Sequence, residues 1–329
     1  MPRCNNMSLR RTKCKVTSFN SGIYLCTDAY PSLIAGHSQS GLRARSATQE
    51  SLTFRAKQPQ SCPVPASPDP DFQTLLATAH ALADRAGAVI LPHFRSGAAA
   101  DHKGGDSFDP VTAADRDAET AIREALRDSY PDHGMIGEEF GSRGAGARYC
   151  WVVDPIDGTR AFIMGQPLWG TLIGLTLDAT PLLGIMDQPF TGERFFSDER
   201  DSFLRHGGAT NRIESRKGVA LQDALLACTS PDLFVTGIER DRFEALSRAA
   251  RLRRFGGDCY NYCLLALGLV DLVVESGLKS FDIVPLIPIV ERAGGVVSTW
   301  DGGDPRGGGR ILAAGDPKLH AAAVEILSP

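Results

Sequence analysis

The stretch "WVVDPIDGTRAF", residues 151 to 162, limits the possible folds of this chain more than any other. Its first three residues, Trp151 to Val153, are typical of a buried strand, and the apolar residues after the turn indicate a helix. Pro155 fixes one backbone φ angle, and Gly158 permits backbone geometry that a larger side chain resists. A buried strand that ends in a rigid turn with two aspartates is costly unless something binds there. We therefore expect a binding site at this junction.

Asp154 and Asp157 are three residues apart on this turn and could share a pair of hard cations, with the Ile156 carbonyl directed at one of them. A helix that begins at Gly158 would direct backbone N–H groups and its positive dipole end at an anion beside those cations. This combination favours a phosphate ligand. The alternative is a simple capped turn, in which Asp157 is the N-cap and Asp154 is exposed.

Two further stretches carry carboxylates next to apolar residues. In "MIGEEF", Glu138 and Glu139 follow an apolar pair, and in "KSFDIV", Asp282 precedes an apolar helix. Each has a purely structural alternative, namely surface charge after a strand for the glutamates and a helix cap for Asp282. Three acidic stretches together indicate a metal centre more strongly than any one of them alone.

Regular secondary structure is expected from Asp71 onward. Apolar residues recur at helical spacing up to about Phe94, and a second helix follows in "DPVTAADRDAETAIREALRDSYPD". The short strands "YCWVVD", "GTLIGLTL", "LLGIMDQP" and "RFFSD" predict a mostly antiparallel sheet backed by these two helices. After Gly208, strands and helices alternate up to a last helix from Lys318. The sequence thus predicts an α+β domain at 71–329 with two subdomains, about 71–208 and 209–329.

Composition excludes several classes of partner. The chain has 329 residues, 43% of them hydrophobic, which suffices for a large core, and a formal net charge of -4. Nucleic-acid binding needs clustered Lys and Arg, and the body shows no such cluster, so we expect no nucleic-acid partner. No apolar run reaches the length of a membrane span, so we expect no membrane partner. The eight cysteines form no C-x-x-C pair, which favours a reducing compartment.

The first 70 residues differ from the rest in charge. They carry a charge of +6 against -10 for residues 71–329, are rich in Ser and Thr, and end in the linker "QPQSCPVPASPDP". Such composition is typical of a transit peptide, so we interpret 1–70 as a removable arm and expect a location in the plastid stroma. The alternatives are a mitochondrial or cytoplasmic location, a disordered tail, or translation from Met7.

The segments "GEEF", "WVVDPIDGTRAF" and "FDIVPLIPIVERAGG", in this order, resemble the inositol monophosphatase family of magnesium-dependent, lithium-sensitive phosphatases. The resemblance extends from about Phe72 to the C-terminus. It implies a layered α/β/α/β/α fold, a homodimer, two to three Mg²⁺ ions per subunit, and inhibition by Li⁺ and Ca²⁺.

The resemblance also implies roles for individual residues. Glu138, Asp154 and the Ile156 carbonyl would bind one Mg²⁺, and Asp154, Asp157 and Asp282 a second, while a third, weaker ion would also rely on Glu138. Gly158 and Thr159 would donate backbone N–H groups to phosphate oxygens. The metals would activate a water for in-line attack on phosphorus and stabilise the charge that develops.

Asp115 and Thr159 would orient the attacking water by the same resemblance. Asp115 has a local alternative, because Thr112 and Asp115 also form a capping box at the start of the second helix, and the two roles can coexist. Lys103, before a Gly-Asp loop, is expected to be a surface residue and no ligand.

Three stretches most resemble the branch of this family that hydrolyses histidinol phosphate in plants and actinobacteria: "GIMDQP", "FGGDCYNYCLLALGLVDLVVESGLKSFD" and "ILAAGD". Histidinol phosphate offers an ammonium and an imidazole, so its pocket should hold unpaired carboxylates. Asp258, at the start of an expected helix 258–268, and Glu275, seven residues before Asp282, meet this requirement. Asp187 could contact the imidazole. The alternatives are an N-cap for Asp258 and a turn residue before Pro189 for Asp187.

The sequence therefore predicts a magnesium-dependent phosphatase of histidinol phosphate. Inositol 1-phosphate or a sugar monophosphate is the alternative substrate. A noncatalytic family member is a third possibility, but such a protein would normally have lost a ligand, and the four metal carboxylates and Thr159 are all present.

Overall fold

The computed structural model describes residues 70–96, 101–102, 110–111 and 113–328. Contacts divide the chain into two units, Met1–Pro65 and Ala66–Pro329, and every described residue belongs to the second. The arm and linker up to residue 69, Lys103 and Thr112 lie outside the described residues, so what the sequence predicts for them stays a prediction.

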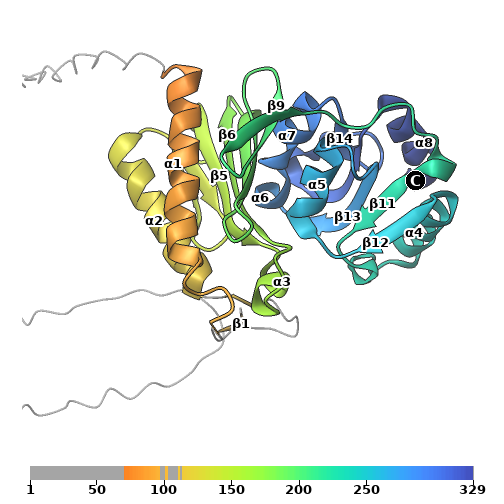
Figure 1. Ribbon diagram of the computed structural model, residues 1–329, viewed down its shortest axis with the longest axis horizontal. Coiled ribbons are helices and arrows are strands. Elements are labelled where there is room, and N and C mark those ends of the chain that lie inside the picture. The colour runs from red at the N-terminus through yellow and green to blue at the C-terminus, as the bar shows by residue number, and fades with distance from the viewer. Residues whose placement is uncertain (1–69, 97–100, 103–109, 112, 329) are drawn as a thin grey trace, which may run out of the picture. The chain divides into compact units, whose positions relative to one another are not determined.

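Two long helices, α1 (Phe72–Ile90) and α2 (Ala113–Ser129), cover one face of the larger sheet (Figure 1). The carboxylate of Asp71 caps α1 by accepting the Thr74 N–H at 2.9 Å. The apolar positions of both helices follow the helical period and are buried against the sheet, as the sequence predicts: Leu75, Leu76, Ala79, Leu82, Ala83, Ala86, Ile90, Ala114, Ala118, Ile122 and Leu126.

The larger sheet has eight strands in the order β10-β9-β8-β7-β6-β5-β3-β4. All neighbours are antiparallel except β3 and β5, which are parallel. The strands are β3 (Gly134–Gly137), β4 (Gly141–Arg143), β5 (Tyr149–Asp157), β6 (Gly170–Leu177), β7 (Thr180–Gln188), β8 (Glu193–Ser197), β9 (Ser202–His206) and β10 (Ala209–Ile213). Two short strands, β1 (Asp101–His102) and β2 (Pro110–Val111), pair separately.

The smaller sheet has five strands in the order β12-β11-β13-β15-β14. Strand β11 runs parallel to both β12 and β13, whereas β15 is antiparallel to β13 and β14. The strands are β11 (Leu225–Cys228), β12 (Leu252–Phe255), β13 (Leu272–Leu278), β14 (Val296–Thr299) and β15 (Gly309–Ala314).

Helices α5 (Asp258–Ala266), α6 (Ser280–Ile283) and α7 (Leu286–Arg292) lie between the two sheets (Figure 1). Helices α4 (Gly237–Ala249) and α8 (Pro317–Leu327) cover the outer face of the smaller sheet. Three buried apolar clusters fill the interior: one lies between α1, α2 and the larger sheet, one surrounds the central helices and contacts both sheets, and one lies between the smaller sheet and α4 and α8. This is the layered α/β/α/β/α arrangement that the sequence predicts, and the α+β fold class is confirmed.

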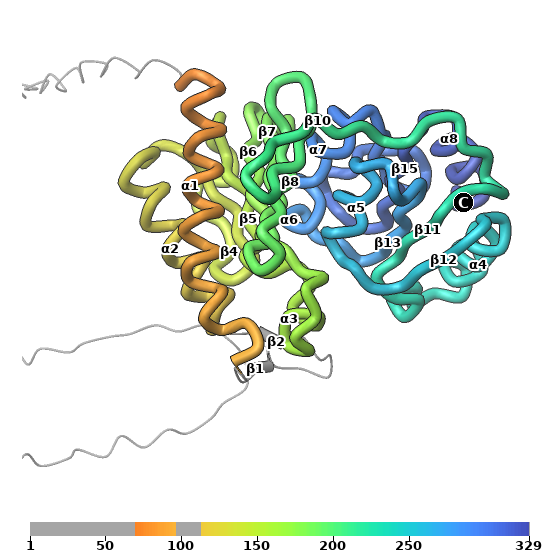
Figure 2. The backbone as a smooth tube through the Cα atoms, viewed as in Figure 1, coloured from red at the N-terminus to blue at the C-terminus, as the bar shows by residue number. Residues whose placement is uncertain are grey.

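Two boundaries differ from the expected ones. The approximate division at 208/209 falls inside the β9–β10 hairpin, and the chain leaves the larger sheet after Ile213 before it crosses to the smaller one (Figure 2). The single helix expected after Asp282 is two short helices, because Pro285 follows α6 and has no N–H to continue its hydrogen-bond ladder.

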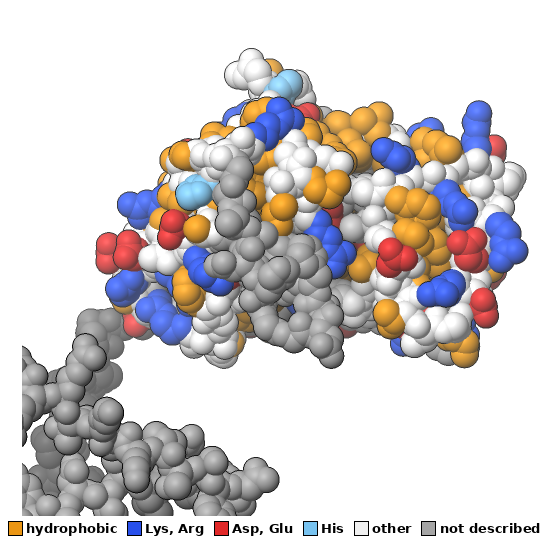
Figure 3. Space-filling model, turned by 90° about the horizontal axis from the view of Figure 1, so that it is seen from below, with side chains coloured by type: hydrophobic (Ala, Val, Ile, Leu, Met, Phe, Trp, Pro, Cys, Tyr) orange, Lys and Arg blue, Asp and Glu red, His pale blue; other side chains and the backbone are white. Residues whose placement is uncertain are grey.

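The charged side chains of one face and the described cysteines bear on possible partners. On the face in Figure 3, Lys and Arg side chains are interspersed with Asp and Glu. Among the described residues, no helix is long and apolar enough to cross a membrane. The four described cysteines, Cys150, Cys228, Cys259 and Cys263, are free and buried.

Candidate active site

A β-bulge at the end of β5 places Asp154 and Asp157 on the same side of the sheet. Asp154 pairs with Leu172 of β6, but Asp157 pairs with Gly170, so three steps on β5 match two on β6. Without the extra residue, side chains three apart would point to opposite faces. Pro155 suits this position because its missing N–H breaks no ladder bond at a bulge, and the Thr171 hydroxyl donates to its carbonyl at 2.7 Å.

The turn after the bulge is held by hydrogen bonds and by a glycine. Asp154 accepts the Ile156 N–H at 3.0 Å, and the Thr159 hydroxyl donates to the Ile156 carbonyl at 3.0 Å. Gly158 has φ +88° and is the N-cap of the short helix α3 (Thr159–Ile163). A Cβ on Gly158 would lie 2.9 Å from the Leu168 carbonyl oxygen, so only glycine fits both the conformation and the space.

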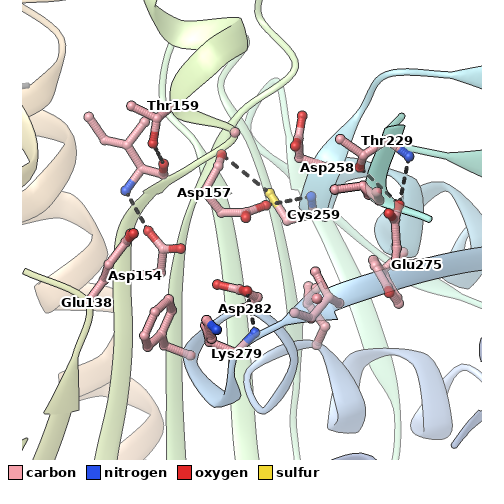
Figure 4. Close-up of a pocket in the computed structure, with 18 of the residues that line it drawn as sticks. Glu138, Asp154, Asp157, Thr159, Thr229, Asp258, Cys259, Glu275, Lys279 and Asp282 are labelled. Atoms are coloured by element: carbon pink, nitrogen blue, oxygen red, sulfur yellow. Dashed lines mark hydrogen bonds between the residues drawn. The ribbon is translucent and has the colours of Figure 1, made fainter. Parts of the chain in front are cut away.

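Asp157 is no N-cap; its carboxylate accepts the Cys259 N–H at 2.6 Å (Figure 4). This bond ties the turn to the start of α5, which belongs to the other half of the chain. Asp282 comes from α6, where its carboxylate accepts the Lys279 N–H at 2.6 Å. Ligand oxygens of Asp154, Asp157 and Asp282 all lie within 4.8 Å of one another.

Glu138 completes this cluster from the turn between β3 and β4. Figure 4 shows its carboxylate beside that of Asp154, and both line one pocket with Asp157 and Asp282. The structure thus brings together all five predicted metal ligands, including Ile156 of the same turn.

Burial and mutual repulsion make these carboxylates unstable as anions. Burial first, and then the charges of Glu138, Asp157 and Asp282, raise the pKa of Asp154 well above its usual value. Burial, followed by the charges of Asp258 and Asp282, also raises the pKa of Asp157. Burial raises the pKa of Asp282 to about 7, and Glu138 adds to this effect. A divalent cation would remove the repulsion, so an all-oxygen donor set of this kind fits Mg²⁺.

The two predicted water-orienting residues, Asp115 and Thr159, lie on different helices, α2 and α3. Asp115 lies in the first turn of α2, is 1% exposed, and is close enough to Asp154 to raise the pKa of that carboxyl through its charge. Thr159 lines the pocket, and its hydroxyl donates to the Ile156 carbonyl. Gly158 lines the pocket as well, so the predicted phosphate-binding pair is at the site.

The pocket has a volume of about 390 Å³ and extends from the cluster of Glu138, Asp154, Asp157 and Asp282 to a second acidic group in the smaller-sheet half. Asp258 is the first residue of α5, whose N-cap is Gly257, so the N-cap alternative for Asp258 is not what the structure shows. Burial raises the pKa of Asp258 to about 6, although Arg160 of α3 opposes the shift.

Glu275 lies on β13 and is 1% exposed. One of its oxygens accepts the N–H and the hydroxyl of Thr229, at 2.8 and 2.9 Å. In the described part of the structure, its other oxygen and the buried hydroxyl of Tyr262 on α5 have no hydrogen-bond partner. Burial raises the pKa of Glu275 to about 8. An unsatisfied buried carboxylate in a pocket is suited to a cationic or hydrogen-bond-donating ligand.

Asp187 is not in this pocket, which corrects the expectation that it contacts the substrate. Its carboxylate is buried and pairs with Arg194 at 2.6 Å, and Arg194 also reaches Asp84 of α1 at 2.7 Å. Both interactions are structural, because the first links β7 to β8 and the second links β8 to the helical layer.

Sequence reasoning missed four residues that line the pocket: Arg160, Thr229, Tyr262 and Lys279. Arg160 and Lys279 lie within the quoted stretches "WVVDPIDGTRAF" and "KSFDIV" and could have been found as the cations nearest in sequence to the carboxylates. Thr229 gives no local signal, because only the parallel pairing of β11 and β13 places it beside Glu275.

The fold and this acidic pocket define a class of layered α+β proteins with a carboxylate-rich candidate metal centre. The inositol monophosphatase family model matches residues 71–328. The chain is 38% identical over 270 residues to a chloroplastic bifunctional phosphatase of Arabidopsis thaliana, covering 79% of this chain and 76% of that one. It is 36% identical over 209 residues to a histidinol-phosphatase of Mycobacterium tuberculosis, covering 63% and 80%.

Among solved structures, an inositol monophosphatase from Zymomonas mobilis shares 41% identity with a TM-score of 0.70, covering 79% of this chain and all of that one. The chain belongs to the inositol monophosphatase family. It is a phosphatase of that family, whose members are in general magnesium-dependent.

Proposed function

We propose that this protein is a magnesium-dependent phosphatase that hydrolyses L-histidinol phosphate to L-histidinol. The observation that carries the proposal is the second acidic group of the pocket, Asp258 and Glu275, which faces a metal cluster of four other carboxylates. A phosphate ester with a cationic end matches both ends of such a pocket. Inositol phosphate, which carries hydroxyl groups only, would leave these buried carboxylates without a countercharge.

The raised pKa values of Asp258 and Glu275, which arise from burial, support a cationic substrate. An ammonium or imidazolium group would lower both pKa values and stabilise the charged carboxylates. The free oxygen of Glu275 and the hydroxyl of Tyr262 offer further polar contacts in the same region.

At the other end, Glu138, Asp154 and the Ile156 carbonyl would hold one Mg²⁺, and Asp154, Asp157 and Asp282 a second, with a third relying on Glu138. Bound Mg²⁺ supplies Lewis acidity, which activates water and offsets the charge of the phosphate. Gly158 and Thr159 would donate N–H groups to the phosphate oxygens. Asp115 and Thr159 would orient the attacking water, and Asp115 would accept its proton.

Several properties complete the proposal. We infer two to three Mg²⁺ ions per subunit and inhibition by Li⁺ and Ca²⁺, as well as a homodimer with no nucleic-acid or membrane partner. We place the protein in the plastid stroma, with residues 1–70 as the transit peptide and linker. The chloroplastic relative of A. thaliana supports this location.

The relatives support a phosphatase of this kind but differ in substrate. Histidinol-phosphatases of M. tuberculosis and of Chlorobaculum parvum are 36% and 34% identical, and an inositol monophosphatase of Mesembryanthemum crystallinum is 32% identical. Inositol 1-phosphate is therefore the alternative substrate to measure.

The test is Mg²⁺-dependent phosphate release by the purified full chain from L-histidinol phosphate and from myo-inositol 1-phosphate. We expect kcat/KM to favour histidinol phosphate by about a hundredfold or more, which corresponds to about 2.7 kcal/mol. Comparable values would replace the proposal with a broad monophosphatase. Bound Mg²⁺ without turnover of either ester would make the protein a noncatalytic family member.

A further inference from the structure

Glu119 of α2 is a buried carboxylate to which neither the sequence motifs nor the proposed reaction gives a role. Its side chain is 0% exposed and lies one helical turn after Asp115 on the same face of the helix. Asp115 and Glu119 are both buried residues of α2, and Glu119 does not line the pocket.

The carboxylate of Glu119 holds the turn that carries Glu138. It accepts the N–H groups of Glu139 and Phe140, at 2.7 and 3.3 Å, and the Nε–H of Arg123 at 2.6 Å. Arg123 also donates to the Gly141 carbonyl at the start of β4. Both backbone donors immediately follow Glu138 in the chain.

The other side of Glu138 is held by the sheet. Its own N–H donates to the Val153 carbonyl of β5 at 3.3 Å. Gly137, the last residue of β3, lets the Glu119 carboxylate approach, because a Cβ there would lie 2.2 Å from its Oε1. Glu138 is therefore fixed on both sides, by β5 before it and by Glu119 after it.

We infer that Glu119 is a positioning residue that sets the orientation of Glu138 and thereby the affinity of the centre for Mg²⁺. A charged acceptor can receive the two N–H groups and the guanidinium at once, whereas a neutral amide cannot, because its NH₂ would face another donor. Residues that orient metal ligands typically contribute 10- to 100-fold to metal affinity or activity. The inference rests on the proposed metal centre.

The experiment compares Mg²⁺ binding by calorimetry in the full-length wild type, in Glu119→Gln and in a matched control, Asp271→Asn. Asp271 is also 0% exposed and also accepts a backbone N–H, that of Leu225 at 2.7 Å, and an arginine, Arg216. It lies next to β11 and does not line the pocket. Both variants lose stability for the same reason, so a difference in Mg²⁺ affinity reports the role of Glu119.

We expect Glu119→Gln to weaken Mg²⁺ binding by about tenfold or more and Asp271→Asn to change it less than about twofold. Raising Mg²⁺ should restore turnover of the Glu119→Gln variant. Equal affinities in the two variants would overturn the inference, whereas a wild type that binds no Mg²⁺ would overturn the proposed function itself.

Gly137→Ala provides a second variant in which Glu119 keeps its charge but is displaced by the added Cβ. We expect the same loss of Mg²⁺ affinity, together with faster hydrogen exchange at the Glu139 and Phe140 amides. Wild-type affinity in this variant would overturn the inference. If neither variant folds, Glu119 is a folding determinant rather than a positioning residue, and the inference fails as well.

Discussion

At the scale of single residues, the backbone of Asp258 is as unusual as its side chain. Gly256, Gly257 and Asp258 have φ values of +87°, +124° and +42°, so three successive residues are in the left-handed region. Aspartate and asparagine tolerate this region better than other residues with a Cβ. Such strain is commonly found where a side chain must be presented to a ligand. It therefore supports a role for Asp258 beyond that of a helix start.

Asp258→Asn removes the charge and keeps the tolerance for positive φ. If the carboxylate binds the cationic end of the substrate, KM for histidinol phosphate should rise more than about tenfold, by about 1.4 kcal/mol. Turnover of p-nitrophenyl phosphate, which has no cationic group, should stay unchanged. Steady-state kinetics on both esters measure this.

Asp258→Ala serves as the companion variant, and we expect the same rise in KM. A loss in the alanine variant alone would assign the effect to backbone strain. Equal losses on both esters would mean that Asp258 supports the whole site rather than the choice of substrate.

At the scale of elements, the bulge between β5 and β6 places Asp154 and Asp157, three residues apart, on the same face of the sheet. Thr171 of β6 is fully buried and stabilises the bulge by its bond to the Pro155 carbonyl. Thr176, on the same strand, makes a comparable bond to the Cys150 carbonyl at 3.2 Å, away from the bulge. Substituting each threonine in turn therefore separates the loss of a buried hydrogen bond, which both variants share, from a change in the geometry of the site, which is expected for Thr171 alone.

Thr171→Val should lower the free energy of unfolding by about 1–2 kcal/mol, because the Pro155 carbonyl loses its partner in a buried position. It should also weaken Mg²⁺ binding, because Asp154 and Asp157 flank that carbonyl. Thr176→Val should cost about as much stability and leave Mg²⁺ affinity unchanged. Denaturant unfolding and calorimetry check both. An unchanged Mg²⁺ affinity in Thr171→Val would show that the bulge does not depend on this bond.

The ion pair between Arg194 and Asp187 links the neighbouring strands β8 and β7, and Arg194 also reaches Asp84 of the helical layer. Arg194→Met would leave Asp187 buried without its partner and should cost about 3–5 kcal/mol of stability. The double variant Arg194→Met/Asp187→Leu should recover much of that loss. The exposed pair of Arg212 and Asp201 gives the comparison, since Arg212→Met should cost about 1 kcal/mol or less. Chemical denaturation measures all three, and KM should not change because Asp187 lies outside the pocket.

At the scale of the whole molecule, the pocket gathers six carboxylates from both halves of the chain, and their repulsion links stability to pH. Asp258, Asp282 and Glu275 have pKa values raised by burial to about 6, 7 and 8, from 3.8, 3.8 and 4.5. The folded protein therefore retains protons that the unfolded chain releases. This contribution to stability is complete below the unfolded pKa values and is lost as pH rises through the folded ones.

Without divalent cations, the melting temperature should therefore decrease between about pH 4 and pH 8. With saturating Mg²⁺ the decrease should be smaller or reversed, because the cation binds the deprotonated carboxylates and binding releases protons. Thermal unfolding across this range, with EDTA and with Mg²⁺, tests both statements. A melting temperature that rises with pH in EDTA would contradict the arrangement of buried carboxylates.

The sequence alone indicated the carboxylates of the candidate metal site and most of the elements around it. "WVVDPIDGTRAF" predicts a strand, a rigid turn and a helix from local periodicity and from the properties of proline and glycine. The carboxylates Glu138, Asp154, Asp157 and Asp282 are recognisable because each stands beside an apolar element. The order and period of the elements predict two helices on a mostly antiparallel sheet, and the resemblance to the family implies the five layers.

Only the tertiary structure decided which side chains share the pocket. Asp187 and Asp258 both lie in stretches that resemble the histidinol-phosphate branch of the family, yet Asp187 pairs with Arg194 whereas Asp258 lines the pocket together with the carboxylate cluster. Asp115 and Glu119 are both acidic residues of the predicted helix at α2, and no local pattern shows that Glu119 accepts the Glu139 and Phe140 N–H groups of the turn after β3. The physical reason is that burial, strand register and a one-residue bulge depend on packing between segments far apart in the chain, whereas periodicity reports local conformation alone.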